Sequence, residues 1–153
     1  MEGTHFFREI ELIGSRGAPI AEFDEIDLVH RVIYEDKIAK GFGQNIGSDL
    51  SPAAYEKALR REITKFVDKK VVDKTEGKIA ALQSPAGIRP SPSGLGTAVA
   101  PDLQAVQSIR NITFRFEGDH SILQEVMNTR MQSLQSKYSN YNFSAVYGYK
   151  PGG

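Results

Sequence analysis

Cysteine is absent from the 153-residue sequence, and this absence excludes several kinds of chemistry. Without a thiol the chain forms no disulfide, holds no zinc–thiolate centre and has no cysteine nucleophile. A chain without disulfides suits a reducing compartment. We therefore expect a protein that acts in the cytoplasm, or in a virion if it is a phage component.

Long apolar runs and an excess of one charge are also missing. No stretch approaches the roughly 18 consecutive apolar residues of a membrane-spanning helix, so we expect no membrane contact. Nineteen basic residues balance nineteen acidic residues, which gives a formal net charge of zero. This balance argues against a dedicated nucleic-acid-binding protein, because such proteins usually carry a basic excess.

Recognisable catalytic and metal-binding motifs are missing as well. The three histidines have no metal-ligand spacing, and the segment "GLGTAVA" follows prolines instead of the strand that a dinucleotide-binding loop requires. Asp119 beside His120 could serve a small hydrolase, but a cap at Asp119 or Ser121 on the next helix is the simpler interpretation. We expect no enzymatic activity and no cofactor.

Four clustered acids are the remaining candidates for a metal site: Glu22, Asp24, Glu25 and Asp27. Their carboxylates are the hard oxygen ligands that divalent cations prefer, but they lack the spacing of an EF-hand loop. Negative charge at the N-terminus of a helix explains them more simply. We expect no bound metal.

Hydrophobic periodicity predicts the elements of the N-terminal half. Alternation predicts a strand over 6–13, and 18–23 follows as the return strand of a hairpin. Residues 24–40 fit a helix with an acidic first turn, although their β-branched residues also suit a strand. Ser51 and Pro52 begin a helix over 51–70, and two apolar runs around Gly77 predict a second hairpin over 71–82.

The C-terminal half reads as strand, helix and strand, with the helix beginning near Ser121. We therefore predict an α+β fold: a mixed β-sheet with two or three helices mainly on one face, plus a long Pro/Gly-rich extended arm. The chain forms a single domain over 1–153. The arm, residues 84–108, links an N-terminal ββααββ part to a C-terminal βαβ part.

The central part of this arm poses a physical problem. Residues 84–102 contain four prolines and three glycines and show no hydrophobic period. Fixing each backbone residue costs on the order of 1–2 kcal/mol, so such a segment becomes ordered only on another surface. That surface belongs either to its own domain or to another chain.

These features favour a non-enzymatic structural subunit of a homo-oligomer or larger protein assembly, for example a virion or tail-type ring. The arm and a tyrosine-rich last strand would contact the neighbouring subunits through Ile88, Leu95, Val99, Tyr141, Phe143, Tyr147 and Tyr149. The alternative is a nucleic-acid-binding protein that uses the basic face of helix 51–70, with contacts from Lys57, Arg60, Arg61 and Lys65.

Overall fold

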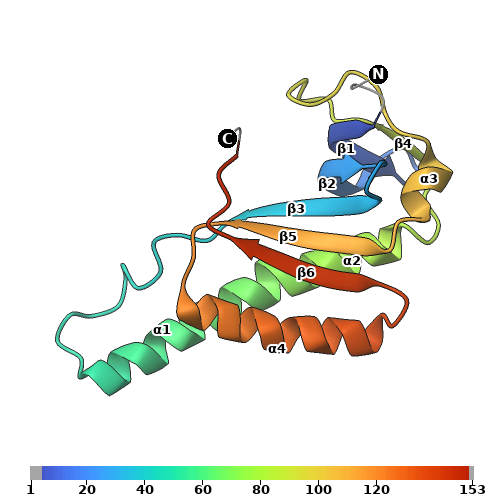
Figure 1. Cartoon of the computed structure of the whole chain (residues 1–153). Helices are drawn as coiled ribbons and strands as arrows, with labels where there is room; N and C mark the ends of the chain where they lie inside the picture. The colour runs from blue at the N-terminus through green and yellow to red at the C-terminus, as the bar shows by residue number, and fades with distance from the viewer. Residues whose placement is uncertain (1–4, 152–153) are drawn as a thin grey trace.

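One mixed sheet of six strands, in the order β4-β1-β2-β3-β5-β6, organises the computed structural model, which describes residues 5–151 (Figure 1). Its strands are β1 (Phe6–Ile13), β2 (Pro19–Asp27), β3 (Val32–Ile38), β4 (Gly87–Pro90), β5 (Asn111–Glu117) and β6 (Asn142–Tyr147). Strands β4, β1, β2 and β3 pair antiparallel, whereas β3, β5 and β6 pair parallel. The predicted α+β class is confirmed.

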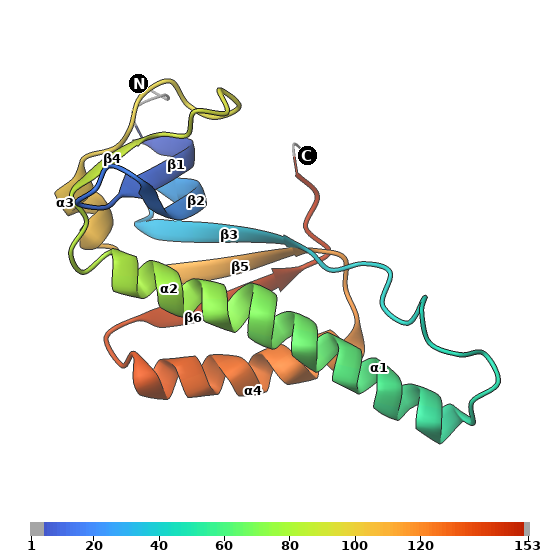
Figure 2. The ribbon, with the colours of Figure 1, turned by 180° about the vertical axis from the view of Figure 1, so that it is seen from behind.

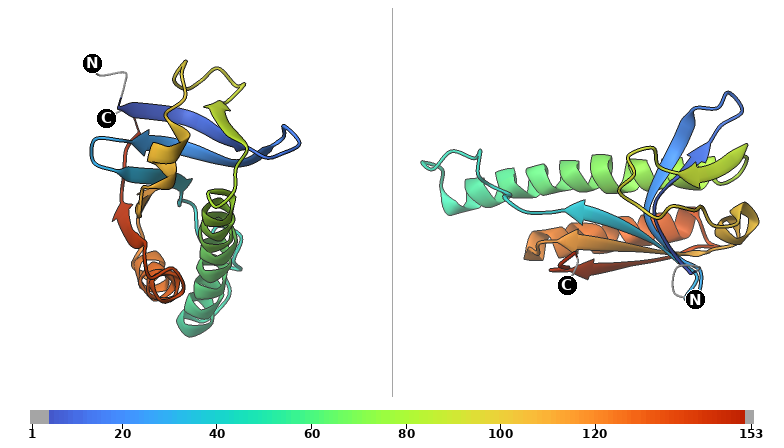
Figure 3. Two further views of the ribbon diagram at one scale, coloured as in Figure 1. Left: turned by 90° about the vertical axis from the view of Figure 1, so that its right-hand side faces the viewer. Right: turned by 90° about the horizontal axis from the view of Figure 1, so that it is seen from above.

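Two long helical segments cover one face of this sheet (Figures 2 and 3). The first consists of α1 (Pro52–Phe66), a π-helical segment η2 (Val67–Val72) and α2 (Asp73–Ala81), which follow one another without a break. The second is α4 (Ser121–Lys137), while α3 (Leu103–Gln107) is a short helix before β5. No helix among residues 5–151 has the length and apolar character needed to cross a membrane.

Helix α1 begins where the sequence predicts. Ser51 caps it, with the Ser51 hydroxyl accepting a hydrogen bond from the Ala54 N–H at 3.2 Å, and Pro52 occupies the first turn. The helical segment then continues to Ala81. The hairpin predicted over 71–82 is therefore wrong, because Val71, Thr75 and Ile79 all turn into the core from one helical face.

The helix predicted over 24–40 is also wrong, because these residues form parts of β2 and β3 and the turn between them. The Asp27 carboxylate closes this turn by accepting hydrogen bonds from the N–H groups of Val29 and His30, at 2.9 and 3.0 Å. Arg31 adopts the left-handed region with φ of 56°. Asp27 thus forms an Asx turn, and Arg31 takes the left-handed position that glycine or asparagine usually occupies.

The predicted strand, helix and strand of the C-terminal half are confirmed as β5, α4 and β6. His120 caps α4, because its Nδ1 accepts a hydrogen bond from the Ile122 N–H at 3.0 Å. The cap was predicted at Asp119 or Ser121, and the Asp119 carboxylate instead accepts from the Gln124 side chain at 2.7 Å. His120 therefore has a structural role.

The long extended arm is not confirmed, because much of residues 84–108 lies on the chain's own sheet. Strand β4 pairs with β1 and forms one edge of the sheet. Beyond β4, the Ser91 N–H donates to the Glu9 carbonyl at 2.8 Å and the Thr97 N–H to the Arg8 carbonyl at 3.1 Å. Hydrogen bonds to β1 of the same chain therefore order part of this segment.

Candidate functional site

The sheet opens between β2 and β3. Backbone pairing of these strands covers only Glu25–Asp27 against Val32–Tyr34. Beyond Tyr34, β3 remains paired with β5, whereas the earlier residues of β2 remain paired with β1. The two halves of the sheet therefore diverge, and Figure 3 shows β1 and β2 running at an angle to the remaining strands.

Polar side chains gather where the strands separate. The Asp24 carboxylate accepts a hydrogen bond from the Asp36 N–H at 2.8 Å, so a side chain replaces the backbone carbonyl of a regular ladder. Since Glu25 pairs with Tyr34, Asp24 and Glu35 are the next residues on either side of the gap. We call Asp24, Glu35, Asp36 and Lys37 the β2–β3 opening.

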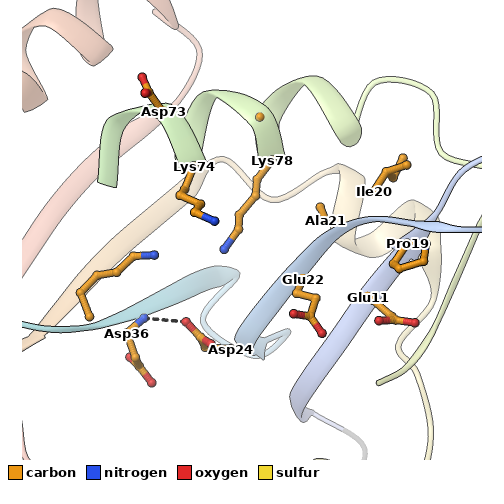
Figure 4. A pocket seen from close by; sticks show the side chains of 12 residues that line it. Glu11, Pro19, Ile20, Ala21, Glu22, Asp24, Asp36, Asp73, Lys74 and Lys78 are labelled. Atoms are coloured by element: carbon orange, nitrogen blue, oxygen red, sulfur yellow. Dashed lines mark hydrogen bonds between the residues drawn. The ribbon is translucent and has the colours of Figure 1, made fainter. Parts of the chain in front are cut away.

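A hollow of about 660 Å³ lies on the helix side of this opening (Figure 4). We call it the helix-side hollow. Helix α2 forms one wall with Lys74 and Lys78, and Figure 4 shows both lysine side chains reaching toward the sheet. The other lining residues are Glu11, Pro19, Ile20, Ala21, Glu22, Asp24, Asp36, Lys37, Asp73 and Gly77. The hollow is therefore lined by both carboxylates and ammonium groups.

Glu35 is buried beside this hollow, with a residue exposure of 2%. Its Oε1 accepts a hydrogen bond from the Lys78 ammonium, whereas its Oε2 is buried and has no hydrogen-bond partner within residues 5–151. Burial raises the pKa of Glu35 to about 7, against the opposing effect of Lys78. An unsatisfied buried oxygen costs about 1–3 kcal/mol, and the raised pKa shows that burial favours the protonated, neutral form of this carboxyl.

Lys37 follows Glu35 by two residues in β3, so both side chains are on the same face of the strand. Burial lowers the pKa of Lys37, and the positive charge of Lys78 lowers it further. A lysine with a lowered pKa gives up its proton more readily than an ordinary lysine. Ionisable groups with perturbed pKa values are found both in catalytic sites and in structural ion-pair networks.

Asp36 points to the other face, where Arg115 fixes it. The Arg115 guanidinium donates to both Asp36 oxygens, at 2.6 and 2.9 Å. It lies between the rings of Tyr34 and Tyr149, with its central carbon 4.2 and 4.4 Å from their centroids. This clamp holds the β3 backbone, and with it the directions of Glu35 and Lys37.

A second hollow, of about 400 Å³, also reaches the β2–β3 opening. It shares Asp24, Asp36 and Lys37 with the helix-side hollow, and adds residues such as Glu9 and Tyr149. Burial raises the pKa of Glu9, and so do the negative charges of Asp24, Glu22 and Asp36. The opening therefore combines negative potential, which attracts cations, with access from two hollows.

The interface residues predicted from the sequence do not gather in one place. Leu95 and Val99 are exposed, at 79% and 59%, whereas Tyr141 is buried in the core. The others are half-buried: Ile88 in β4, Phe143 and Tyr147 in β6, and Tyr149 against Arg115. Strand β6 does lie at an edge of the sheet.

The basic residues of the predicted nucleic-acid face do lie together. Lys57, Arg60, Arg61 and Lys65 line a shallow groove on α1, with Asp68 and Lys69. Arg60 lies 3.4 Å from Glu125 and 3.9 Å from Glu56. Ion pairs therefore neutralise part of this surface.

The sequence analysis missed most of the β2–β3 opening. Asp24 was considered as a metal ligand, but Glu35, Lys37 and Lys78 were not singled out. Glu35 and Lys37 could have been found from the acidic residues of β2 pairing with "YEDK" in β3. This pairing can be predicted only if 24–40 is interpreted as a hairpin.

Comparisons with known proteins leave the site to be interpreted from its own geometry. No protein-family model, no curated protein and no solved structure matches the chain. Across residues 5–151 there is also no group of three or more His, Cys, Asp or Glu side chains arranged to hold a metal ion. Magnesium, however, is usually held by one or two carboxylates, with water and substrate phosphates as the other ligands.

Proposed function

We propose that this protein is a divalent-metal-dependent hydrolase that cleaves phosphodiester bonds in nucleic acid. The observation that carries the proposal is the β2–β3 opening, where Asp24 and Glu35 are the first residues beyond the paired part of the two strands and Lys37 follows two residues along β3. Asp24 and Glu35 would hold the metal. This proposal departs from the non-enzymatic role expected from the sequence, which stays a prediction.

The helix-side hollow is lined by five carboxylates and three lysines. In this proposal the Lys74 ammonium contacts the phosphate oxygens, and the bound metal would offset the negative charge of the carboxylates. Asp24, Asp36 and Lys37 line both hollows, so a substrate bound in either hollow would lie beside these three side chains.

The chemistry follows from the roles of three side chains. A metal held by Asp24 and Glu35 would supply charge stabilisation for the phosphate and lower the pKa of a bound water. Lys37 holds the attacking water and accepts the proton that the water loses. The water oxygen bonds to phosphorus as the bond to the leaving sugar oxygen breaks, and that oxygen takes a proton from solvent.

The test uses the full chain with labelled single- and double-stranded DNA and RNA, in Mg²⁺ or Mn²⁺. We expect cleavage that EDTA abolishes. Asp24→Asn, Glu35→Gln and Lys37→Met should each slow it by at least about 100-fold. Asp73→Asn is the matched control, because Asp73 lines the same hollow but has no role in the mechanism, and should leave the rate unchanged.

Two results would overturn this proposal. One is the absence of cleavage with all four substrates in either metal. The other is cleavage that persists in excess EDTA or in folded Glu35→Gln protein. Circular dichroism spectra of the variants separate a lost activity from a lost fold.

The role as an assembly subunit remains a second candidate. It is favoured by the exposed apolar side chains of Leu95 and Ile38, which both line the second hollow. Apolar groups beside a hollow are common in protein interfaces.

A further inference from the structure

The shallow groove on α1 has a volume of about 520 Å³ and shares no residue with the two hollows at the β2–β3 opening. We call it the α1 groove. Apart from Thr64, its lining consists of five cations and one acid: Lys57, Arg60, Arg61, Lys65, Lys69 and Asp68. Four of the cations are exposed and recur every fourth residue, and we call them the cationic row: Lys57, Arg61, Lys65 and Lys69.

The acids that alternate with the cationic row in the sequence have partners elsewhere. The Arg130 guanidinium of α4 donates to both Asp68 oxygens, at 2.5 and 3.2 Å. The Glu62 carboxylate accepts a backbone N–H from the loop before α1 at 3.2 Å, and Glu56 lies 3.9 Å from Arg60. Among residues 5–151, no carboxylate oxygen lies within 4 Å of a charged nitrogen of the row. The row therefore keeps its positive charge.

An unpaired row of this kind works against the helix that carries it. Like charges four residues apart on a helix repel each other and destabilise it, and the row contains three such pairs in succession. A partner that brings negative charge at regular intervals would remove this repulsion. The row is thus complementary to a repeating polyanion.

The dimensions of the row suit a polymer better than a small anion. With a helical rise of 1.5 Å per residue, neighbouring cations are about 6 Å apart along the axis and the whole row spans about 18 Å. Figures 2 and 3 show the first turns of α1 extending beyond the strands. A long anionic chain can therefore lie along this part of the helix.

The α1 groove lacks the features of a protein or membrane contact. No apolar residue lines it, whereas protein interfaces depend on a few buried aromatic or apolar anchors. A helix on a membrane surface inserts its apolar face into the lipid, but Leu59 and Ile63 of α1 are buried in the protein core. The lining instead offers ammonium and guanidinium groups, which bind phosphate strongly.

We propose that the α1 groove binds the phosphate backbone of nucleic acid, with each cation of the cationic row contacting one phosphate. This inference goes beyond the proposed function, because it concerns a separate surface whose binding needs neither metal nor cleavage. It also revises the residues expected from the sequence: Arg60 is engaged by Glu56 and Glu125, and Lys69 joins the contacts. Phosphate contacts carry no base information, so this binding is independent of base sequence.

Fluorescence anisotropy with labelled single- and double-stranded DNA and RNA tests the binding. EDTA is present throughout, so that no metal-dependent cleavage takes place. We expect binding at about 50 mM salt that weakens steeply as salt is added. Four phosphate contacts predict a slope of about −3 to −4 for the logarithm of the binding constant against the logarithm of salt concentration.

Substitutions in the row test its role. Arg61→Gln and Lys65→Gln should each make that slope shallower by about 0.7–0.9, the value for one phosphate contact. Glutamine at all four positions of the row should weaken binding at about 50 mM salt by at least about 100-fold. Lys70→Gln is the matched control, because Lys70 is exposed on the same helical segment but lies outside the groove. It should leave the slope unchanged.

Three results would overturn the inference. The first is the absence of binding to all four nucleic acids at about 50 mM salt. The second is an equal effect of Lys70→Gln and Lys65→Gln, which would show that only overall charge matters. The third is binding to vesicles of phosphatidylcholine and phosphatidylserine but not to nucleic acid, which would assign the groove to a membrane surface.

Failure of this inference is distinguishable from failure of the proposed function. If the protein cleaves nucleic acid in Mg²⁺, but the fourfold glutamine variant binds as well as the wild type in EDTA, only the inference about the α1 groove fails. If binding depends on the cationic row but no cleavage occurs, only the proposed function fails. Circular dichroism spectra confirm that each variant keeps its helices.

Discussion

At the scale of single residues, Asp27 determines the geometry of the site although it lies outside it. Its side chain is 2% exposed and accepts hydrogen bonds from the N–H groups of Val29 and His30, with the His30 imidazole 2.7 Å away. Burial alone would raise the pKa of Asp27, but the hydrogen bonds from His30 and Val29 outweigh it and lower the pKa. The turn that brings β2 next to β3 therefore depends on an ionised carboxylate.

Asp27→Asn tests this dependence. We expect a loss of about 1–3 kcal/mol in the free energy of unfolding at pH 7, because charge-assisted hydrogen bonds become weaker neutral ones. A group with a lowered folded-state pKa stabilises the fold above its unfolded pKa, about 3.9 for Asp, and loses this effect as the pH falls through its folded-state pKa. The difference between wild type and variant should therefore shrink below pH 4.

Urea unfolding at pH 7 and at pH 3 measures that difference. Asp49→Asn on an exposed loop is the control and should change little at either pH. An unchanged stability of Asp27→Asn at pH 7 would show that the turn does not need the charge.

The same turn explains why the site could not be predicted from the sequence. It contains no glycine, proline or asparagine, and Arg31 takes the left-handed conformation without a sequence signal. Read as a helix, 24–40 separates Asp24 from Glu35 and makes Asp24 a helix-terminal acid. Read as a hairpin, it places the two carboxylates across one gap. Because this one turn was not predicted, neither the end of β2, nor β3, nor the β2–β3 opening could be predicted.

At the scale of elements, the long helical segment could be predicted only in part. Leu59, Ile63, Val67, Val71, Thr75 and Ile79 recur every four residues and are all buried. A regular α-helix has 3.6 residues per turn, so a four-residue repeat would drift around its surface. The wider turns of η2 reduce this drift and keep the stripe on the sheet. The sequence does not show these wider turns, so its β-branched residues near Gly77 favoured a prediction of strands.

Gly77 gives a prediction about this helix. Its φ is not positive, and an added Cβ would meet nothing within 4 Å, so only the cost of glycine in a helix remains. Gly77→Ala should raise the free energy of unfolding by about 0.5–1 kcal/mol. Thermal and urea unfolding measure this change.

Gly118 provides the contrasting variant. Its φ is +117°, and an added Cβ would lie 2.3 Å from the Ala39 carbonyl oxygen. Gly118→Ala should therefore destabilise the protein. If Gly77→Ala destabilises it too, residues 71–81 do not form the uninterrupted helix described above.

At the scale of the whole molecule, the sequence indicated that residues 84–102 become ordered only through contacts with residues outside this segment. It could not say which surface, because the edge of β1 that β4 covers is distant in sequence. The alternation of 6–13 predicted that β1 is a strand, but pairing across more than 70 residues leaves no local pattern. The role of this segment in an assembly stays a prediction.

Gly96 is the position that tests where this segment belongs. An added Cβ there would lie 2.1 Å from the Arg8 carbonyl oxygen and 2.5 Å from the Glu9 Cβ, so a side chain at 96 cannot coexist with docking on β1. Gly96→Val should cost about 1–3 kcal/mol of stability and speed hydrogen exchange at the Ser91 and Thr97 amides. Gly87→Ala is the control, because its Cβ would meet nothing within 4 Å.

The mass of the same variant decides between the two roles of this segment. If it serves only its own sheet, light scattering gives Gly96→Val the same mass as the wild type, whether 16.9 kDa or a multiple of it. If it joins subunits, the mass falls and the Ser91 and Thr97 amides exchange faster, because the other chain that protects them has dissociated. A lower stability with an unchanged mass would therefore place the segment on its own sheet.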